Sequence, residues 1–282
     1  MPAVPNSAER RPEDRRKVTV PDLARFREQG RRIAMITAYD ATFARLVDRA
    51  GVDMILVGDS VATVVQGERT TIPVDIGEMV YHVRCVARAH TKALVVGDLP
   101  FGSYHSSASQ AVESSVALVK AGAEAVKLEG GVAVSDTIAA ITRCDIPVVG
   151  HIGLTPQSYH RMGGHRVQGR QAGYEAGGRE RIIEDAVAVE AAGACAVVIE
   201  GVPHDLASEI TAKISIPTIG IGAGPGCSGQ VLVLHDVLGL SDCRYRFAKQ
   251  YAELGVAVVE ATRAYVDEVH DGSWPDLAHS FL

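Results

Sequence analysis

The sequence predicts an α/β fold in which eight parallel strands close into a (β/α)8 TIM barrel, because short runs rich in Val, Ile and Leu alternate with Ala-rich amphipathic segments. The strand runs are almost continuously apolar, as expected for strands covered on both faces, which favours a closed barrel over an open sheet. Elements such as Ala50-Gly51-Val52 and Ala121-Gly122-Ala123 fit helix caps that lead into the next strand. A chain of 282 residues has the length of one such barrel.

The elements follow one another in a regular order. Residues 1–20 are rich in Pro, Arg and Glu without apolar periodicity, so we expect a mobile arm, or one that docks on a neighbouring subunit. Residues 21–282 are expected to form a single catalytic barrel domain, entered through a short amphipathic helix near Val20-Pro21-Asp22-Leu23. The expected strands lie at 32–39, 53–58, 93–98, 125–129, 147–152, 195–200, 216–221 and 231–235. The expected helices lie at 41–50, 75–90, 106–121, 133–143, 178–193 and 204–213, with a long closing helix at 244–268.

Composition and charge exclude several classes of protein. The net charge of −6 argues against a general nucleic-acid binder, and 47% hydrophobic with 22% charged residues is ordinary for a soluble enzyme. No apolar run approaches the ~18 residues of a membrane span, and the N-terminus has no apolar signal core. The five cysteines are scattered and form no Cys-x-x-Cys pair, which suits reduced thiols. We therefore expect a cytoplasmic protein that acts on small molecules, without a nucleic-acid or membrane partner.

Four of the expected strands end in a carboxylate, namely Asp59, Asp98, Glu129 and Glu200. An acid at the end of a buried strand is costly unless a metal, a catalytic role or fixed hydrogen bonds satisfy it. Because the carboxyl ends of barrel strands share one face, these acids should converge there, together with Lys127, His151 and Asp40.

This set of side chains favours a hard divalent cation, Mg²⁺, over zinc, because it offers several acidic oxygens with no Cys and little His nearby. Two or three protein carboxylates suffice for Mg²⁺, which keeps other positions for water or substrate. The alternative is that the acids serve as helix N-caps or as structural ion pairs with Lys127.

Lys127 and Glu129 lie two residues apart on one strand and therefore share a face. An ammonium on that face could neutralise a bound carboxylate or a developing enolate, although a structural salt bridge or a Schiff-base lysine would use the same residue. Glu200 ends an apolar strand, where burial would raise its pKa and suit it to act as a general base; a capping or ion-paired acid is the alternative.

Three further features carry weaker signals. The segment 153–178 is long for a connection between a strand and a helix and holds Arg161, Arg166 and Arg170, which fits a lid that meets an anionic substrate, a surface excursion or a subunit contact. The glycines of 220–224 resemble a phosphate-binding turn only weakly, and tight backbone packing explains them better. His151 is expected to be a hydrogen-bonded wall residue rather than a metal ligand.

Several motifs together closely resemble the ketopantoate hydroxymethyltransferase family, and the resemblance spans about residues 22–282 in order. The motifs are Ile36-Thr37-Ala38-Tyr39-Asp40, Val57-Gly58-Asp59-Ser60, Gly97-Asp98-Leu99-Pro100-Phe101, Val126-Lys127-Leu128-Glu129-Gly130-Gly131, Gly150-His151-Ile152-Gly153-Leu154-Thr155-Pro156-Gln157-Ser158, Val167-Gln168-Gly169-Arg170, Gly220-Ile221-Gly222-Ala223-Gly224 and Gly229-Gln230-Val231-Leu232-Val233-Leu234-His235-Asp236.

The resemblance implies a barrel of the phosphoenolpyruvate/pyruvate type, a cytoplasmic location and a place in pantothenate biosynthesis. It implies transfer of a hydroxymethyl group from 5,10-methylenetetrahydrofolate to 3-methyl-2-oxobutanoate through a magnesium-stabilised enolate, giving 2-dehydropantoate. By position, Asp59, Asp98 and Glu129 match the family's Mg²⁺ site, Asp59, Ser60, Asp98 and Lys127 match its 2-oxoacid contacts, and Glu200 matches its proton acceptor. A homo-oligomer, with a decamer as the family form, is a further implication.

The chain departs from the family pattern in the arm at 1–20, at Ser228 and at Ala278, and these departures concern loop, folate or assembly contacts. A different Mg²⁺-dependent enzyme that forms an enolate on the same barrel is the nearest rival, but no cysteine lies where a lyase of the isocitrate-lyase kind would need one. A catalytically silent metabolite-binding barrel is a rival of another class, and four costly strand-end acids argue against it.

Overall fold

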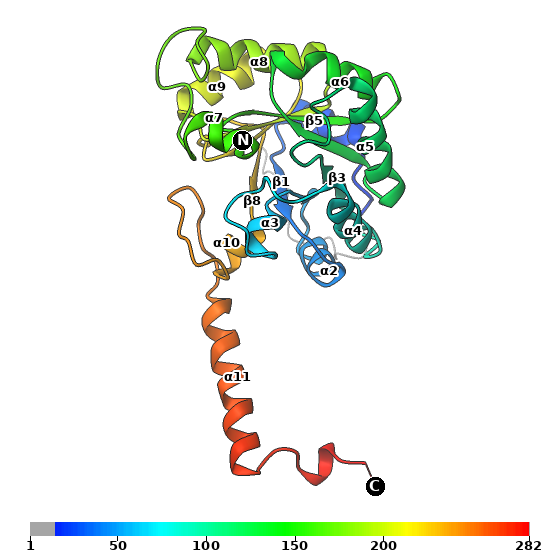
Figure 1. Cartoon of the computed structure of the whole chain (residues 1–282), viewed down its shortest axis with the longest axis vertical. Helices are drawn as coiled ribbons and strands as arrows, with labels where there is room; N and C mark the ends of the chain where they lie inside the picture. The colour runs from blue at the N-terminus through cyan, green and yellow to red at the C-terminus, as the bar shows by residue number, and fades with distance from the viewer. Residues whose placement is uncertain (1–14, 282) are drawn as a thin grey trace, which may run out of the picture. The chain divides into compact units, whose positions relative to one another are not determined.

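The computed structural model describes residues 15–281 and contains the predicted closed barrel. Each strand pairs in parallel with the next one along the chain, and the last pairs with the first. Figure 1 shows helices of the barrel unit lying outside the strands. The strands are β1 Ile33–Thr37, β2 Met54–Val57, β3 Leu94–Asp98, β4 Ala125–Glu129, β5 Val148–Gly153, β6 Ala196–Glu200, β7 Thr218–Ile221 and β8 Gly229–Leu232. The predicted fold class and all eight strands are thus confirmed.

The last strand is the one whose bounds differ most from the prediction. It was expected at 231–235, whereas β8 begins at Gly229 and a short helix, α10 Leu234–Leu238, begins soon after it ends. A side chain at Gly229 would come within 2.4 Å of the carbonyl oxygen of Ile33 on β1, so glycine allows the two backbones to pair here. Gly229, which lies outside the predicted strand, is therefore part of the barrel wall.

The helices between the strands lie close to their predicted positions. They are α2 Ala41–Arg49, α4 Ile76–Ala87, α5 Ala108–Ala121, α6 Ser135–Thr142, α8 Arg179–Ala191 and α9 His204–Lys213. Four short turns were not predicted: α3 Val61–Val64, the 3₁₀ turns η2 Val132–Val134 and η3 Pro156–Ser158, and α7 Tyr159–Met162. The last two lie in the long segment after β5, at the face where that strand ends.

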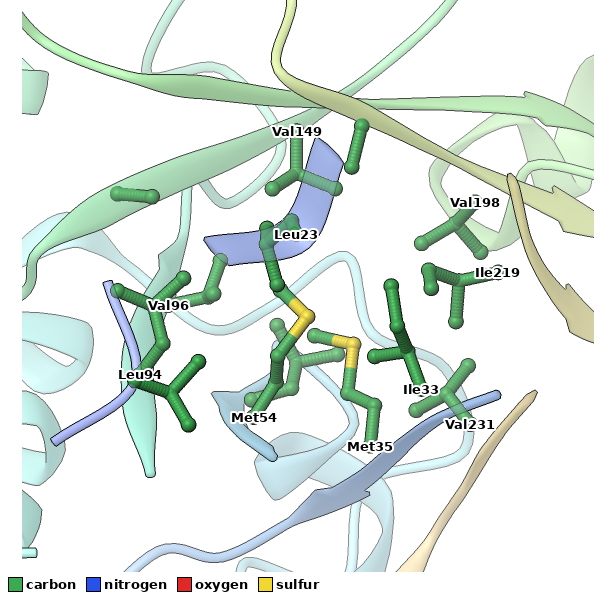
Figure 2. Close-up of a cluster of buried hydrophobic side chains, with 14 of the residues drawn as sticks. Leu23, Ile33, Met35, Met54, Leu94, Val96, Val149, Val198, Ile219 and Val231 are labelled. Atoms are coloured by element: carbon green, nitrogen blue, oxygen red, sulfur yellow. The ribbon is translucent and has the colours of Figure 1, made fainter. Parts of the chain in front are cut away.

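Helix α1 Val20–Glu28, the predicted entry helix, packs into the barrel core. Its Leu23 is fully buried in one cluster with Ile33, Met54 and Leu94, each the first residue of its strand, and Figure 2 shows Leu23 among these side chains. The helix therefore covers the amino ends of the strands with apolar side chains. This leaves the carboxyl ends as the polar end of the barrel.

The arm predicted over residues 1–20 falls partly outside the described residues, which begin at residue 15. The remainder contacts the barrel. The backbone N–H of Val18 donates to the carbonyl of Lys92 at 2.8 Å, and Lys17 Nζ donates to the carbonyl of Ala93 at 2.8 Å.

Residues Leu234–Leu282 form a second compact unit, separate from the unit that ends at Val233. It contains α10, the long helix α11 Leu254–Asp271 and the 3₁₀ turn η4 Leu277–His279. The closing helix expected at 244–268 thus begins ten residues later, because the chain first folds back so that the N–H of Tyr251 donates to the carbonyl of Val237 at 2.8 Å. The single catalytic domain over 21–282 stays a prediction. Within the described part of the chain, no helix has both the length and the apolar character to cross a membrane.

Candidate active site

The carboxyl ends of β2 to β6 bring the predicted side chains to one end of the barrel. Asp59 comes two residues after β2, Asp98 ends β3, and Lys127 and Glu129 lie on β4. Asp98 is 1% exposed and Lys127 is 3% exposed, so these charges are held out of water. Charged groups this deeply buried require partners of opposite charge or fixed hydrogen bonds.

The centre of the cluster is an ion pair between neighbouring strands. Lys127 Nζ lies 2.8 Å from Asp98 Oδ1, and the register pairs these two residues directly across β3 and β4. The other carboxylate oxygen of Asp98 accepts the backbone N–H of Asp59 at 3.1 Å. Asp98 is therefore fixed from two sides, and Asp59 is held beside it.

His151 on β5 links this pair to the remaining acids. Its Nδ1 lies 3.4 Å from both Lys127 Nζ and Glu129 Oε1, while its Nε2 lies 3.2 Å from Glu200 Oε2. Glu200, at the end of β6, is the least buried member, with 19% of its side chain exposed. The structure therefore places His151 in the wall of the site, where the sequence predicted it.

Burial and mutual charge shift the pKa values of this cluster. Burial, reinforced by Glu129, raises the pKa of Asp59, and burial raises the pKa of Asp98 to about 6 against the opposing effect of Lys127. Burial lowers the pKa of Lys127, but the carboxylates of Asp98, Glu129 and Asp59 outweigh it and raise that pKa above its usual value. Burial and Lys127 lower the pKa of His151, yet its contacts with Glu129 and Glu200 raise it to about 9. Lys127 therefore stays a charged ammonium, and its positive charge balances only part of the negative charge of the carboxylates around it.

Two of the predicted rim residues have local partners. Ser60 follows Asp59, and its hydroxyl lies 2.9 Å from the hydroxyl of Tyr39 at the end of the neighbouring strand. Asp40 caps helix α2, since its Oδ1 accepts the N–H groups of Thr42 and Phe43 at 2.7 and 2.9 Å. For Asp40, the helix-cap alternative therefore describes the geometry.

The long segment between β5 and α8 docks on the barrel at several points. The N–H of Gln168 donates to the carbonyl of Gly201 at 2.9 Å, just after β6. Arg161, Arg166 and Arg170 of this segment are exposed. At the turn after β7, a side chain at Gly224 would come within 2.4 Å of His204 Cβ, which supports tight packing as the reason for the glycine.

Sequence reasoning missed two residues of the cluster, Gln157 and Tyr104. The Gln157 side chain donates to Asp59 Oδ2 at 2.9 Å, and its backbone N–H donates to Glu129 Oε2 at 2.9 Å. The Tyr104 hydroxyl donates to Gln157 Oε1 at 2.7 Å. Both residues come from loops, where strand spacing gives no signal about direction. The one available signal was the position of Gln157 directly after the strand that carries His151.

The oxygen ligands of this cluster fit an open site for a hard cation, in which water and substrate supply some of the ligands, better than a site in which protein side chains supply all of them. As the side chains stand, no group of three His, Cys, Asp or Glu within residues 15–281 is arranged to hold a metal ion. Mg²⁺ nevertheless needs only one or two protein carboxylates besides water and substrate oxygens. Glu129 Oε1 is buried and makes no hydrogen bond within the described residues, since its contact with His151 Nδ1 is 3.4 Å long. Such an oxygen, next to Asp59 and Asp98, is the kind of group that a cation would satisfy.

The comparisons with known proteins agree with this geometry. The family model of ketopantoate hydroxymethyltransferase matches residues 17–277. The chain is 54% identical over 270 residues to the 3-methyl-2-oxobutanoate hydroxymethyltransferase of Pelobacter propionicus, covering 95% of this chain and 98% of the relative. It is 55% identical to the protein of the same name from Moorella thermoacetica, covering 95% and 98%.

Solved structures with the same fold are far more distant in sequence. A 2,3-dimethylmalate lyase of the PEP mutase/isocitrate lyase superfamily aligns with a TM-score of 0.60 at 17% identity, over 93% of this chain and 91% of that chain. A phosphonopyruvate hydrolase, solved with oxalate and Mg²⁺, aligns with a TM-score of 0.60 at 15% identity, over 93% of each chain. These two show the shared barrel, whereas the family match and the close relatives show descent: the chain belongs to the ketopantoate hydroxymethyltransferase family.

Proposed function

We propose that this chain transfers a hydroxymethyl group from 5,10-methylenetetrahydrofolate to 3-methyl-2-oxobutanoate, giving 2-dehydropantoate for pantothenate biosynthesis, with Mg²⁺ as its cofactor. The observation that carries the proposal is the buried cluster of Asp59, Asp98, Lys127 and Glu129 at the carboxyl end of the barrel. In a chain of this family, such a cluster supports a reaction that develops negative charge on a 2-oxoacid.

Asp59, Asp98 and Glu129 are the residues we propose to hold Mg²⁺, because their carboxylates lie together and Glu129 Oε1 is left without a hydrogen bond among the described residues. When bound, Mg²⁺ would act as a Lewis acid on the 2-oxo group and so acidify the C3–H bond of the substrate.

Lys127 and Ser60 are proposed to bind the 2-oxoacid together with Asp59 and Asp98. The Lys127 ammonium is rigidly held by Asp98 at 2.8 Å, so it can stabilise the negative charge of the substrate without reorganising. The Ser60 hydroxyl, held by Tyr39, offers a donor at the end of β2.

Glu200 is the proposed base that removes the C3 proton. It is the most exposed acid of the cluster and therefore the one best placed to exchange protons with substrate and solvent. The proton passes to the Glu200 carboxylate, and the electron pair stays on the substrate as an enolate. The C3 carbon then forms a bond to the one-carbon unit of the folate, water supplies the hydroxyl oxygen, and tetrahydrofolate leaves.

The test is a proton NMR time course in D₂O with 3-methyl-2-oxobutanoate and Mg²⁺, before and after 5,10-methylenetetrahydrofolate is added. We expect the C3 proton signal to disappear first and a hydroxymethyl signal to follow, both abolished by EDTA. Glu200→Gln should slow the exchange by ~10²-fold or more, as for the loss of a general base. Glu184→Gln, at an exposed acid of α8, is the matched control and should change neither rate.

Near-wild-type exchange in Glu200→Gln would remove that residue from the base role. Exchange without transfer would retain the enolising site and reject the folate donor, and absence of exchange in the wild type would reject the substrate. The same family membership supports a cytoplasmic homo-oligomer, with the decamer as the form to test by analytical ultracentrifugation.

A further inference from the structure

Gln157 occupies an unusual place for a loop residue, because it connects the carboxyl ends of three strands other than its own. It lies in η3, after β5, yet its side chain donates to Asp59 Oδ2 after β2 at 2.9 Å and to the carbonyl of Leu99 after β3 at 3.0 Å. Its backbone N–H donates to Glu129 Oε2 at the end of β4. These strand ends carry three of the four acids of the cluster, namely Asp59, Asp98 and Glu129.

Both polar atoms of the Gln157 side chain are hydrogen-bonded, in three bonds altogether. Both partners of its NH₂ group, Asp59 Oδ2 and the Leu99 carbonyl, are acceptors, so the amide can be oriented in only one way. Its Oε1 accepts the hydroxyl of Tyr104 at 2.7 Å. The side chain is 5% exposed, which makes these bonds costly to lose.

The same contacts fix two carboxylates without using all of their oxygens. Gln157 donates hydrogen bonds to Oδ2 of Asp59 and to Oε2 of Glu129. It thus binds one oxygen of each acid and restrains both side chains. Glu129 Oε1 is left buried and makes no hydrogen bond within the described residues, with His151 Nδ1 in contact at 3.4 Å. Groups that hydrogen-bond metal ligands in this way set their orientation, and their loss typically lowers metal affinity about 10–100-fold.

We propose that Gln157 is a positioning residue of the metal site, which holds Asp59 and Glu129 with one oxygen each turned to the cation, and which couples the segment after β5 to that site. The inference rests on the proposed function only in that the cluster binds a divalent cation. The Tyr104 hydroxyl holds the Gln157 side chain in place by its hydrogen bond to Oε1.

The experiment measures cation affinity directly, with Mn²⁺ as a paramagnetic substitute for Mg²⁺ and free Mn²⁺ followed by electron paramagnetic resonance. Gln157→Met keeps the length of the side chain and the backbone bond to Glu129 but removes every side-chain bond, so the Kd for Mn²⁺ should rise about 10–100-fold. Tyr104→Phe removes the hydrogen bond to Gln157 Oε1 but leaves the bonds of Gln157 to Asp59 and Glu129. It should therefore raise the Kd for Mn²⁺ by a smaller factor.

Thr218→Val is the matched control. It also removes buried hydrogen bonds of the barrel, to Ser228 and Thr211, but at the amino end of β7. Its Kd for Mn²⁺ should equal that of the wild type even where its melting temperature falls. In Gln157→Met, raising Mg²⁺ should restore most of the turnover, because the ligands are loosened rather than removed.

The outcomes separate this inference from the proposed function. If wild type binds Mn²⁺ and Gln157→Met binds it equally well, the positioning role is wrong while the metal site stands. If Thr218→Val loses affinity as much as Gln157→Met, in step with melting temperature, Gln157 serves stability alone and the inference is again wrong. If the wild type binds no Mn²⁺, both the metal site and the role of Gln157 fall.

Discussion

Replacement of Lys127 by methionine tests whether the buried ammonium holds the acidic cluster together. The substitution keeps the length of the side chain and removes its charge, which lies 2.8 Å from Asp98 Oδ1. At that distance the attraction is about 6 kcal/mol with an effective dielectric constant of about 20, before desolvation is subtracted. Removing one partner of a buried pair typically costs about 3–5 kcal/mol, because the other charge stays buried without compensation.

The lower end of that range is expected here, because Asp98 can take up a proton and so lose its uncompensated buried charge. Burial already raises the pKa of Asp98 to about 6 while Lys127 opposes the rise, so without Lys127 the pKa must lie higher. A loss of about 3 kcal/mol corresponds to a melting temperature lower by about 6–12 °C in a domain of this size. The folded variant binds the Asp98 proton more tightly than the folded wild type, so the deficit should shrink as pH falls toward about 6 and level off below it, where both folded proteins carry that proton.

Thermal unfolding followed by circular dichroism in EDTA, at pH 7.5 and pH 5, measures both effects. Lys120→Met, at an exposed lysine in the last turn of α5, is the control for loss of a positive charge. If Lys127→Met melts within about a degree of Lys120→Met at pH 7.5, Lys127 does not neutralise the cluster and the reasoning is refuted. A deficit of the same size at both pH values would refute the assignment of Asp98 as the partner.

Two further predictions concern the same end of the barrel and its packing. Because burial raises the pKa of Asp98 to about 6, protons should compete with Mn²⁺ at lower pH, so that its Kd rises about tenfold per unit below pH 6; a Kd that is flat from pH 7.5 to 5 would exclude Asp98 from the site. Gly150→Ala would place a methyl group 2.4 Å from Val189 Cγ1 and should cost about 1–3 kcal/mol in urea unfolding. Val189→Ala should reduce that cost in the double variant, whereas strictly additive losses would show that the clash is relieved elsewhere.

The strand-end residues were predictable because barrel topology alone decides where they go. Once alternating strands and helices are recognised, Asp98, Glu129 and Glu200 must meet at the carboxyl face, and the structure brings them to one cluster. Asp40 shows the limit of the same argument. It also follows a strand, but the residues after it begin helix α2 directly, so its carboxylate caps that helix. The residues after an acid therefore decide its role as much as the strand before it.

Loop residues were not predictable in the same way. Gln157 and Tyr104 reach the cluster by hydrogen bonds across 98 and 25 residues of sequence, to Asp59 and Glu129 respectively. No periodicity relates such positions, since the direction of a loop side chain depends on contacts that form only in the folded barrel. The burial of Leu23 under the strands was hidden for a similar reason. The amphipathic pattern of α1 predicts a buried face but does not say which surface covers it.

The charges of the cluster give a physical reason why a divalent cation belongs there. With Asp59, Asp98, Glu129 and Glu200 ionised, four carboxylates face two cations. These are the Lys127 ammonium and the His151 imidazolium, whose pKa is raised to about 9, so two negative charges remain in a site almost closed to water. Burial raises the pKa of Asp59 and of Asp98. Where no metal ion balances their charge, these carboxylates therefore bind protons more readily. A doubly charged ion would balance the cluster without protonating it, and Glu129 Oε1, which contacts only His151 Nδ1 at 3.4 Å and makes no hydrogen bond within the described residues, would gain a close partner. The cation and the proton are then alternatives at the same carboxylates, and each should weaken the binding of the other by the same factor.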